Sequence, residues 1–173
     1  MSDNDAQPSP GTSSTNGTNT GGEVRPLINV VSQYVKDLSF ENPNAPASLQ
    51  LASTQPEIKV NVAVNAEALK DGTYEVVLHI SATAHSGETT AFVTDLVYAG
   101  QFAITNASRE VLPAILLVEC PRMLFPFARR VIADATRDGG FPPLLLSPID
   151  FISLYRQQRT AAQGKAPQSA PPT

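Results

Sequence analysis

The sequence predicts an α+β fold in which a four-stranded antiparallel sheet is followed by helices. Two observations lead to this class. In the first half of the chain, runs of alternating apolar and polar residues are separated by short turns, as in strands. In the second half, apolar residues recur at helical spacing. The chain has 173 residues, 42% of them hydrophobic, which suffices for one domain with a hydrophobic core.

The first predicted element, residues 27–40, has an ambiguous pattern. Its apolar residues, among them Val30, Val31 and Tyr34, would also form a stripe on a helix. Its high content of β-branched residues favours a strand instead. The Pro-rich stretch at residues 42–46 is expected to end it.

Three further strands are predicted over residues 58–64, 74–82 and 92–104. Asp71-Gly72 supplies the turn between the first two, and residues 86–88 supply the second turn. Because short turns join neighbouring antiparallel strands, these three strands are expected to form a meander.

A long helix is predicted next, with Ser108 as its N-cap and Gly139-Gly140 at its end. Pro121 and Pro126 lie inside its apolar stripe. Proline lacks a backbone N–H and clashes with the preceding helical turn, so we expect a kink or break between residues 119 and 125.

The segment that follows, residues 141–148, contains three prolines and cannot be helical. It is also more apolar than an ordinary exposed loop. Asp150 is expected to cap a final helix that runs through Tyr155 to about Gln163.

Both ends of the chain differ in composition from its middle. Residues 1–26 and 163–173 are rich in Ser, Thr, Asn, Gly, Pro and Gln and contain no aromatic residue. Too little apolar surface is available there to offset the entropy of ordering, so we expect two disordered tails around a domain at residues 27–162. The N-terminus has no apolar stretch of the kind found in signal peptides, and a single cysteine cannot form an internal disulfide. The chain also has no run of about 18 apolar residues that could insert into a membrane. We therefore expect a cytoplasmic protein.

Charge is divided between the two halves. Residues 1–100 hold 11 acidic and 4 basic side chains, a net charge of −7, and residues 101–173 hold 5 and 8, a net charge of +3. The acidic half is either a solvated surface or a docking surface for a basic partner. The overall charge of −4 disfavours nucleic acid as a partner.

The predicted strands carry apolar residues on both faces, since Val77, Val93, Val97 and Ala99 lie opposite the main stripes. Together with the apolar loop at residues 141–148, this is more apolar surface than one small core can bury. The surplus predicts self-association, a binding groove, or both.

Four stretches of the sequence resemble the SecB family of protein-export chaperones. They are, in chain order, residues 34–46, residues 74–78 leading to 88–93, residues 120–129 (CPRMLFPFAR) and residues 139–151 (GGFPPLLLSPIDF). The resemblance implies a four-stranded antiparallel sheet with a long helix, a proline-rich loop and a second helix packed on one face, assembled as a dimer of dimers. It also implies a holdase without cofactor, metal or catalysis, which keeps secretory preproteins unfolded in the cytosol and delivers them to the motor ATPase SecA.

The resemblance also implies functional residues. The acidic SecA-binding surface falls on Asp37, Glu41, Val93 and Asp95, and Asp95 stands where the family commonly has Glu. A contact between subunits falls on Thr94, Leu96 and Tyr98. We assign seven apolar residues of the strands, the loop and the final helix to a groove that binds clients: Ile58, Val60, Val62, Phe141, Leu144, Leu146 and Tyr155. The alternative is that these residues belong to the hydrophobic core.

Other functions receive less support from the sequence. His79, His85 and Glu75 lack the regular spacing of metal ligands, and Cys120 in an apolar run is expected to be a buried, inert thiol. We therefore expect neither an enzyme nor a metal site. The second hypothesis is a dedicated SecB-like oligomeric chaperone for a narrow client, such as a toxin or antitoxin. No acidic residue follows Asp150, unlike the acidic tails common in the family.

Overall fold

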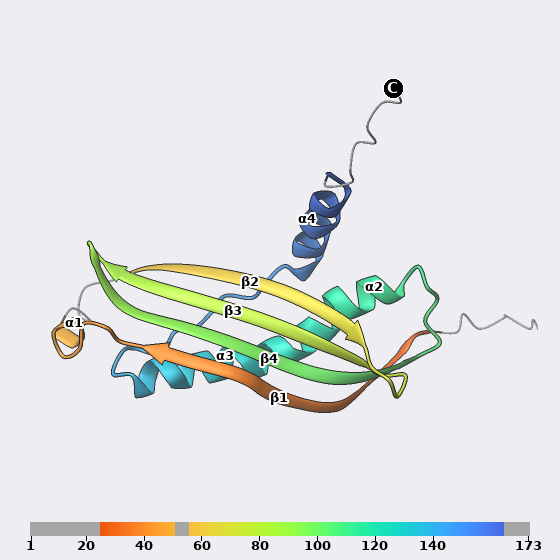
Figure 1. Ribbon diagram of the computed structural model, residues 1–173, viewed down its shortest axis with the longest axis horizontal. Coiled ribbons are helices and arrows are strands. Elements are labelled where there is room, and N and C mark those ends of the chain that lie inside the picture. The colour runs from red at the N-terminus through yellow and green to blue at the C-terminus, as the bar shows by residue number, and fades with distance from the viewer. Residues whose placement is uncertain (1–24, 51–55, 165–173) are drawn as a thin grey trace, which may run out of the picture.

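A computed structural model describes residues 25–50 and 56–164 of the chain (Figure 1). Its four strands form one antiparallel sheet in the order β1-β4-β3-β2. The strands are β1 (Leu27–Glu41), β2 (Glu57–Ala68), β3 (Tyr74–Ser86) and β4 (Thr89–Thr105). The α+β class and the four-stranded antiparallel sheet are therefore confirmed. Most of the two predicted tails, residues 1–24 and 165–173, lies outside the described residues, and residues 163 and 164 are the last two of α4.

The ambiguous first segment is a strand, as predicted. It pairs with β4 from Leu27 opposite Thr105 to Glu41 opposite Val93, with two bulges along the way. The meander of β2, β3 and β4 is confirmed as well. Gly72 and Gly87 adopt positive φ angles of 80° and 61° in its turns, a conformation that glycine reaches without a steric penalty.

Side chains on β3 and β4 alternate between the two faces of the sheet. On the inner face, Val76, Leu78 and Ile80 are fully buried beneath helices. Their neighbours on the outer face, such as Val77 and His79, are only partly buried. The sheet thus has one face that carries the core and one face that is open to a partner.

One helical rod covers the inner face. It consists of α2 (Leu112–Ala114), the π-helical segment η2 (Ile115–Glu119) and α3 (Cys120–Asp138). In η2, the Cys120 N–H donates to the Ile115 carbonyl, five residues back. The predicted N-cap is wrong: Val111 is the N-cap, and Ser108 contributes only its backbone carbonyl, which accepts from the N–H groups of Val111 and Leu112.

Of the predicted kink or break between residues 119 and 125, the break is absent, because α3 continues through both prolines, and the irregularity that is present is η2, which ends at Glu119. The π turn sets Pro121 into the first turn of α3, where a missing N–H costs no intrahelical hydrogen bond. Pro126 lies in the helix interior, between the buried residues Phe125 and Ala128. Packing against the sheet offsets the bond that Pro126 removes.

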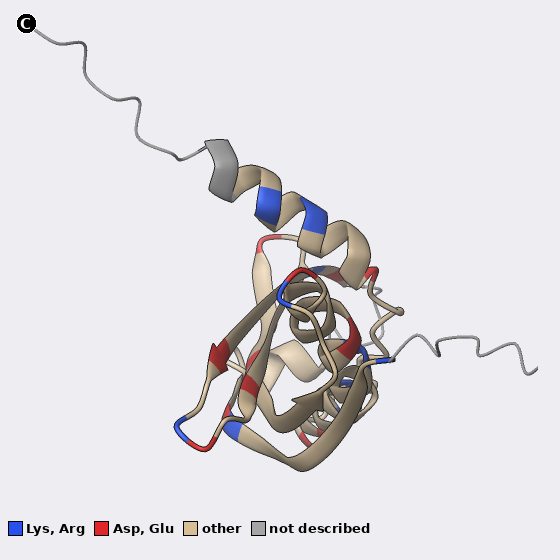
Figure 2. Ribbon diagram, turned by 90° about the vertical axis from the view of Figure 1, so that its right-hand side faces the viewer, with Lys and Arg blue, Asp and Glu red and all other residues tan. Residues whose placement is uncertain are grey.

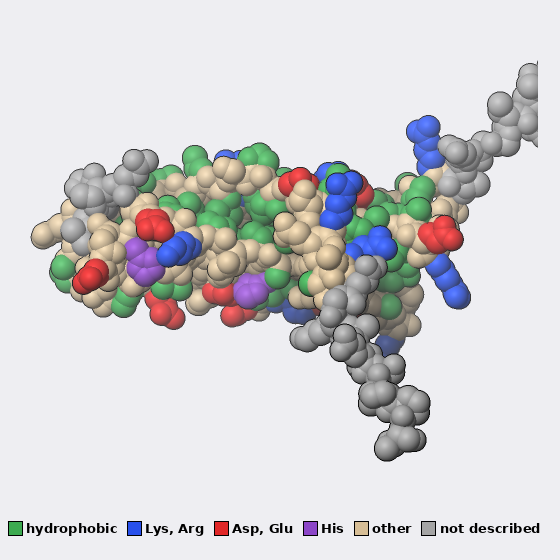
Figure 3. Space-filling view, turned by 90° about the horizontal axis from the view of Figure 1, so that it is seen from above, with side chains coloured by type: hydrophobic (Ala, Val, Ile, Leu, Met, Phe, Trp, Pro, Cys, Tyr) green, Lys and Arg blue, Asp and Glu red, His purple; other side chains and the backbone are tan. Residues whose placement is uncertain are grey.

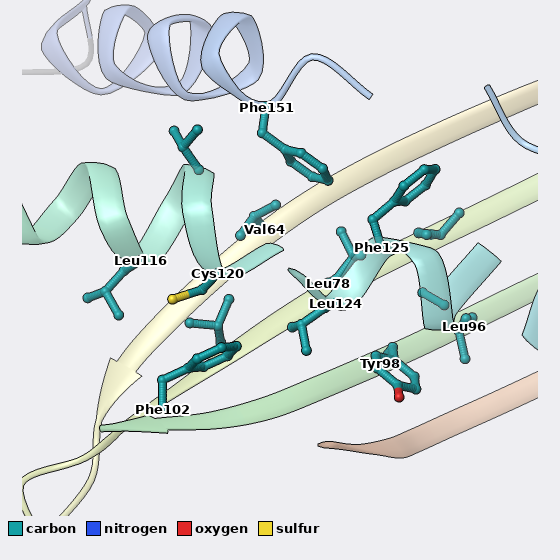
Figure 4. Packing of buried hydrophobic residues seen from close by; sticks show 14 of the residues in the cluster. Val64, Leu78, Leu96, Tyr98, Phe102, Leu116, Cys120, Leu124, Phe125 and Phe151 are labelled. Atoms are coloured by element: carbon teal, nitrogen blue, oxygen red, sulfur yellow. The ribbon is translucent and has the colours of Figure 1, made fainter. Parts of the chain in front are cut away.

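The core lies between the sheet and this rod (Figure 4). Leu78, Leu96 and Phe102 from the strands meet Cys120 and Leu124 from α3, and all five are fully buried. Burial raises the pKa of the Cys120 thiol to about 12, so this cysteine is protonated and inert at neutral pH, as predicted.

The final helix, α4 (Phe151–Gly164), departs from the predicted packing. Asp150 caps it as predicted: its Oδ1 accepts from the N–H groups of Ile152 and Ser153. However, α4 packs against η2 and then projects away from the sheet, so it does not cover the sheet face beside α3 (Figure 1). Phe151 anchors it by meeting the Phe125 ring edge-on, at 6.1 Å between centroids. In Figure 2, the described part of α4 carries basic but no acidic residues.

Candidate binding surfaces

An apolar cavity opens between strand β2 and the proline-rich loop. It has a volume of about 140 Å³. Ile58 on β2 and Phe141 and Leu144 in the loop line it, so three of the predicted client residues meet here. Its other lining residues did not enter the prediction: Pro56, Phe92, Pro142 and Pro143.

Two of the lining residues, Phe92 and Phe141, form an aromatic cluster with Phe40. The Phe92 ring lies 5.7 Å from that of Phe40 and 5.1 Å from that of Phe141, centroid to centroid. Gly139 allows this packing, because a Cβ there would come within 2.2 Å of the Phe40 ring. Gly140, at a φ of 90°, then turns the chain into the loop.

The loop is held in place from α3. Buried Thr136 donates its Oγ1–H within the helix, to the carbonyl of Ile132 at 3.0 Å. The same oxygen accepts the Leu144 N–H at 2.9 Å. An irregular segment rich in proline is thereby fixed over the end of the sheet. Its Leu145 remains 64% exposed.

A second, larger cavity lies at the other end of β2. It measures about 500 Å³ and is bounded by β2, α2, η2 and α4. Val64, Leu112 and Leu116 provide much of its apolar lining. No local signal in the sequence predicts this cavity, because its lining residues continue the same apolar stripes as the core residues.

Strand β2 connects the two cavities. Among the described residues it is an edge strand, with a neighbouring strand, β3, on one side of its backbone only. Strands advance about 3.3 Å per residue, which places Val64 roughly 20 Å from Ile58. Ile58 and Val60 are 37% and 41% exposed. Figure 3, which looks onto this side, shows hydrophobic side chains along the middle of the molecule and acidic and histidine side chains along its lower border.

The other predicted client residues lie elsewhere. Val62 packs partly against the core, and Leu146 is buried within it. Tyr155 lines a third cavity, of about 420 Å³, beside α4 and η2, where the Arg159 guanidinium lies 5.7 Å from its ring centroid. The structure therefore brings Ile58, Phe141 and Leu144 together, with Val60 two residues further along β2, and it separates Val62, Leu146 and Tyr155 from them.

The predicted SecA-binding residues share the outer face of the sheet. Glu41 pairs with Val93 across β1 and β4, and Asp95 lies two pairs further along, opposite Ser39. Asp37 lies two pairs beyond Asp95, opposite Val97. Asp37 and Glu41 are exposed, and Val93 and Asp95 are partly buried. We call these four residues, Asp37, Glu41, Val93 and Asp95, the acidic surface.

The residues predicted for a subunit contact point the other way. Thr94 and Leu96 are fully buried and Tyr98 is 8% exposed, all under the helical rod of the same chain. The Thr94 hydroxyl also donates to the Ser39 carbonyl at 3.0 Å. Alternation along β4 causes this, since residues of this parity face the core while Val93 and Asp95 face outward. A subunit contact through these three side chains would therefore be indirect.

Glu75 forms a hydrogen-bond network further along the outer face. It is 7% exposed and accepts from Lys36 Nζ at 2.8 Å and from the Tyr34 hydroxyl at 2.5 Å. The Lys36 and Tyr34 hydrogen bonds hold the pKa of Glu75 below its usual value. In return, the Glu75 carboxylate raises the pKa of Tyr34 to about 12. This network ties β1 to β3 across β4.

Replacing Glu75 by glutamine (Glu75→Gln) is expected to lower the free energy of unfolding at pH 7 by about 1–3 kcal/mol, because a charge-assisted network loses its acceptor. The Glu75 pKa is lowered on folding, so its contribution is complete above the ordinary value of 4.5 and is lost as pH falls through the folded value. The difference between the variant and the original chain should therefore shrink in acid. Urea denaturation at pH 7 and pH 3.5 measures this. Glu57→Gln, which removes only an exposed pair with Lys59, should change stability by less than about 0.5 kcal/mol.

A comparison with known families decides the identity. A family model described as preprotein translocase subunit SecB matches residues 22–162. The chain belongs to the SecB family. The protein-export protein SecB of Rhodopseudomonas palustris strain BisB5 is 52% identical to this SecB chain, over 87% of it and 96% of the relative. That of Bradyrhizobium diazoefficiens is 48% identical, over 90% of this chain and 99% of the relative.

A solved structure shares the fold of this SecB chain. It is the SecB-like chaperone of Mycobacterium tuberculosis in complex with a ChAD peptide from an antitoxin. The TM-score is 0.58 at 16% sequence identity, and the match covers 71% of this chain and 91% of that one. Within residues 25–50 and 56–164, no helix is both long and apolar enough to cross a membrane.

Proposed function

We propose that this SecB chain is a holdase in the cytoplasm, which binds unfolded secretory preproteins and delivers them to the SecA motor ATPase. One observation carries the proposal: a member of the SecB family has two apolar cavities joined by an exposed edge strand. Extended apolar segments of a client fit such a surface, whereas a compact polar ligand does not. Ile58 and Val60 on β2, with Phe141 and Leu144 from the loop, form the core of the client-binding surface.

The mechanism needs no chemical step and no cofactor. An unfolded preprotein exposes apolar side chains that would otherwise aggregate or enter a folded core. A protein that binds only the unfolded state lowers the free energy of that state, so the folding equilibrium shifts by mass action. Apolar burial is non-directional, which explains how one groove accepts many client sequences.

Assembly as a homotetramer, a dimer of dimers, strengthens this binding. Several weak sites on one particle raise the overall affinity without new contacts. The chain exposes apolar side chains that an assembly would cover, on β1 and on the outward face of α3: Leu27, Val31, Val35, Leu38, Met123 and Phe127.

Docking of SecA falls on the acidic surface. It lies on the outer face of the sheet, opposite the helical rod, so a client on β2 and SecA can be held at the same time. Exposed carboxylates attract a basic partner over a short range, and salt screens that attraction. Delivery then follows from proximity of the client to the motor.

A dedicated chaperone for a narrow client is the second candidate. It is favoured by the structural neighbour from Mycobacterium tuberculosis, whose complex contains an antitoxin peptide. That neighbour shares only its fold with this chain. The relatives that are about 50% identical to this chain are protein-export proteins, which favours the first candidate.

The experiment that separates the two uses the full chain and several unrelated unfolded preproteins. A general holdase suppresses the aggregation of all of them, and light scattering shows a tetramer that gains the mass of one client. Suppression of one client alone would support the dedicated chaperone. No suppression of any would overturn the holdase proposal.

A further inference from the structure

A histidine lies next to the acidic surface, beside one of its carboxylates. The Nε2 atom of His79, on β3, is 2.9 Å from both carboxylate oxygens of Asp95, on β4. The two side chains are 44% and 35% exposed, so both are accessible to a partner. Asp95 is opposite Ser81 and His79 is opposite Val97, which makes the contact a diagonal cross-strand pair on the outer face.

This geometry assigns the direction of the hydrogen bond. An ionised carboxylate only accepts hydrogen bonds, so Nε2 of His79 carries the proton and donates it. The contact therefore persists whether the imidazole is neutral or protonated. What changes with protonation is the charge of the pair: neutral His79 leaves Asp95 its full negative charge, and protonated His79 cancels it.

The other charged groups around His79 cannot replace this effect. On β2, the residue opposite His79 is Ala63, and its outward neighbours Asn61 and Asn65 carry no charge. On β1, Asp37 lies beyond Val97 in the same cross-strand row, and Lys36 is paired with Glu75, which lies on β3 itself. Among the described residues, the ion pair of His79 is with Asp95.

We propose that His79 is a positioning residue of the SecA-docking surface, which orients the Asp95 carboxylate and sets its charge through its own protonation. This inference rests on the proposed docking of SecA to the outer face. A basic side chain of SecA meets an oriented and fully charged carboxylate when His79 is neutral. It meets a neutralised pair with a competing cation when His79 is protonated. Docking is therefore stronger with a neutral His79 than with a protonated one.

The test measures the dissociation constant of SecA for the full chain between pH 6 and pH 8 at low salt. His79→Gln keeps a neutral side-chain donor at every pH, and His79→Arg keeps a positive charge at every pH. His79→Gln should bind SecA about two- to five-fold more tightly than His79→Arg at every pH in this range. The affinity of the original chain should move from that of His79→Arg toward that of His79→Gln as pH rises. This range corresponds to the roughly 0.5–1 kcal/mol of an exposed ion pair.

His85→Gln is the matched control. His85 lies on the same strand and the same outer face, but its Nδ1 contacts the Thr90 hydroxyl at 3.4 Å. This variant should keep the pH dependence of the original chain. Titrating groups of SecA affect all of these chains alike and cancel in the comparison. The inference is overturned if SecA binds but His79→Gln and the original chain respond equally to pH. If SecA binds none of the chains at any pH, the docking proposal is overturned together with it.

Discussion

Replacing Ile58 by glutamate (Ile58→Glu) is expected to weaken the binding of an unfolded preprotein by about ten-fold or more. Ile58 lines the cavity beside the proline-rich loop and remains 37% exposed. A buried isoleucine side chain contributes roughly 1.5–3 kcal/mol, and about 1.4 kcal/mol corresponds to ten-fold in affinity. A carboxylate in this cavity would in addition be desolvated by an apolar client. Suppression of aggregation and the client dissociation constant measure the loss.

Asn61→Glu provides the matched control, because it adds the same charge to the exposed outer face of the same strand. It should leave client binding within about two-fold, and circular dichroism should show both variants folded. Ile58 is a better target than Leu144, since Leu144 also packs against the core and donates its N–H to Thr136. Equal client affinity of Ile58→Glu and the original chain would contradict the proposed groove.

Charge reversal on the acidic surface should have the second large effect. The double variant Glu41→Lys/Asp95→Lys is expected to bind SecA about ten-fold or more weakly at low salt. Each exposed pair contributes roughly 0.2–1 kcal/mol, and reversal replaces attraction by repulsion of similar size. The difference should shrink at about 0.5 M salt, where screening acts over a few ångströms. Client binding should be unchanged, because these residues lie on the face away from the helical rod.

Glu88→Lys/Glu110→Lys changes the net charge by the same amount at exposed positions outside the acidic surface. If this control weakens SecA binding as much as the double variant, total charge rather than the acidic surface governs docking. Calorimetry or surface plasmon resonance at two salt concentrations separates the two explanations.

The strands were predictable from the sequence because their signal is local. Alternation along residues 74–82 reports which side chains face the core, and glycine turns end each run. The helical rod was less predictable. A π turn shifts the register by one residue, which lets Pro121 start a new α-helix where the sequence alone indicated a break. Such a turn has no simple sequence pattern.

The candidate site was predictable in part for a similar reason. The apolar loop at residues 141–148 stood out by composition, and it does line a cavity. Leu146 in the same loop is buried in the core, and Tyr155 lies beside another cavity. Composition identifies surplus apolar surface, but it does not say which other element covers each side chain. His79 lay two strands away from Asp37, and only the register of β3 on β4 brings its ring to Asp95.

The sequence by itself therefore determined the fold class, the membership of the SecB family suggested by its motifs, and the division between an acidic first half and a basic second half. Each of these depends on residues that are close in the chain or on its composition. Tertiary structure alone decided that β1 pairs with β4, that α4 projects from the sheet, and that β2 joins two cavities. These features depend on contacts between residues far apart in the chain, whose free energies no local pattern records.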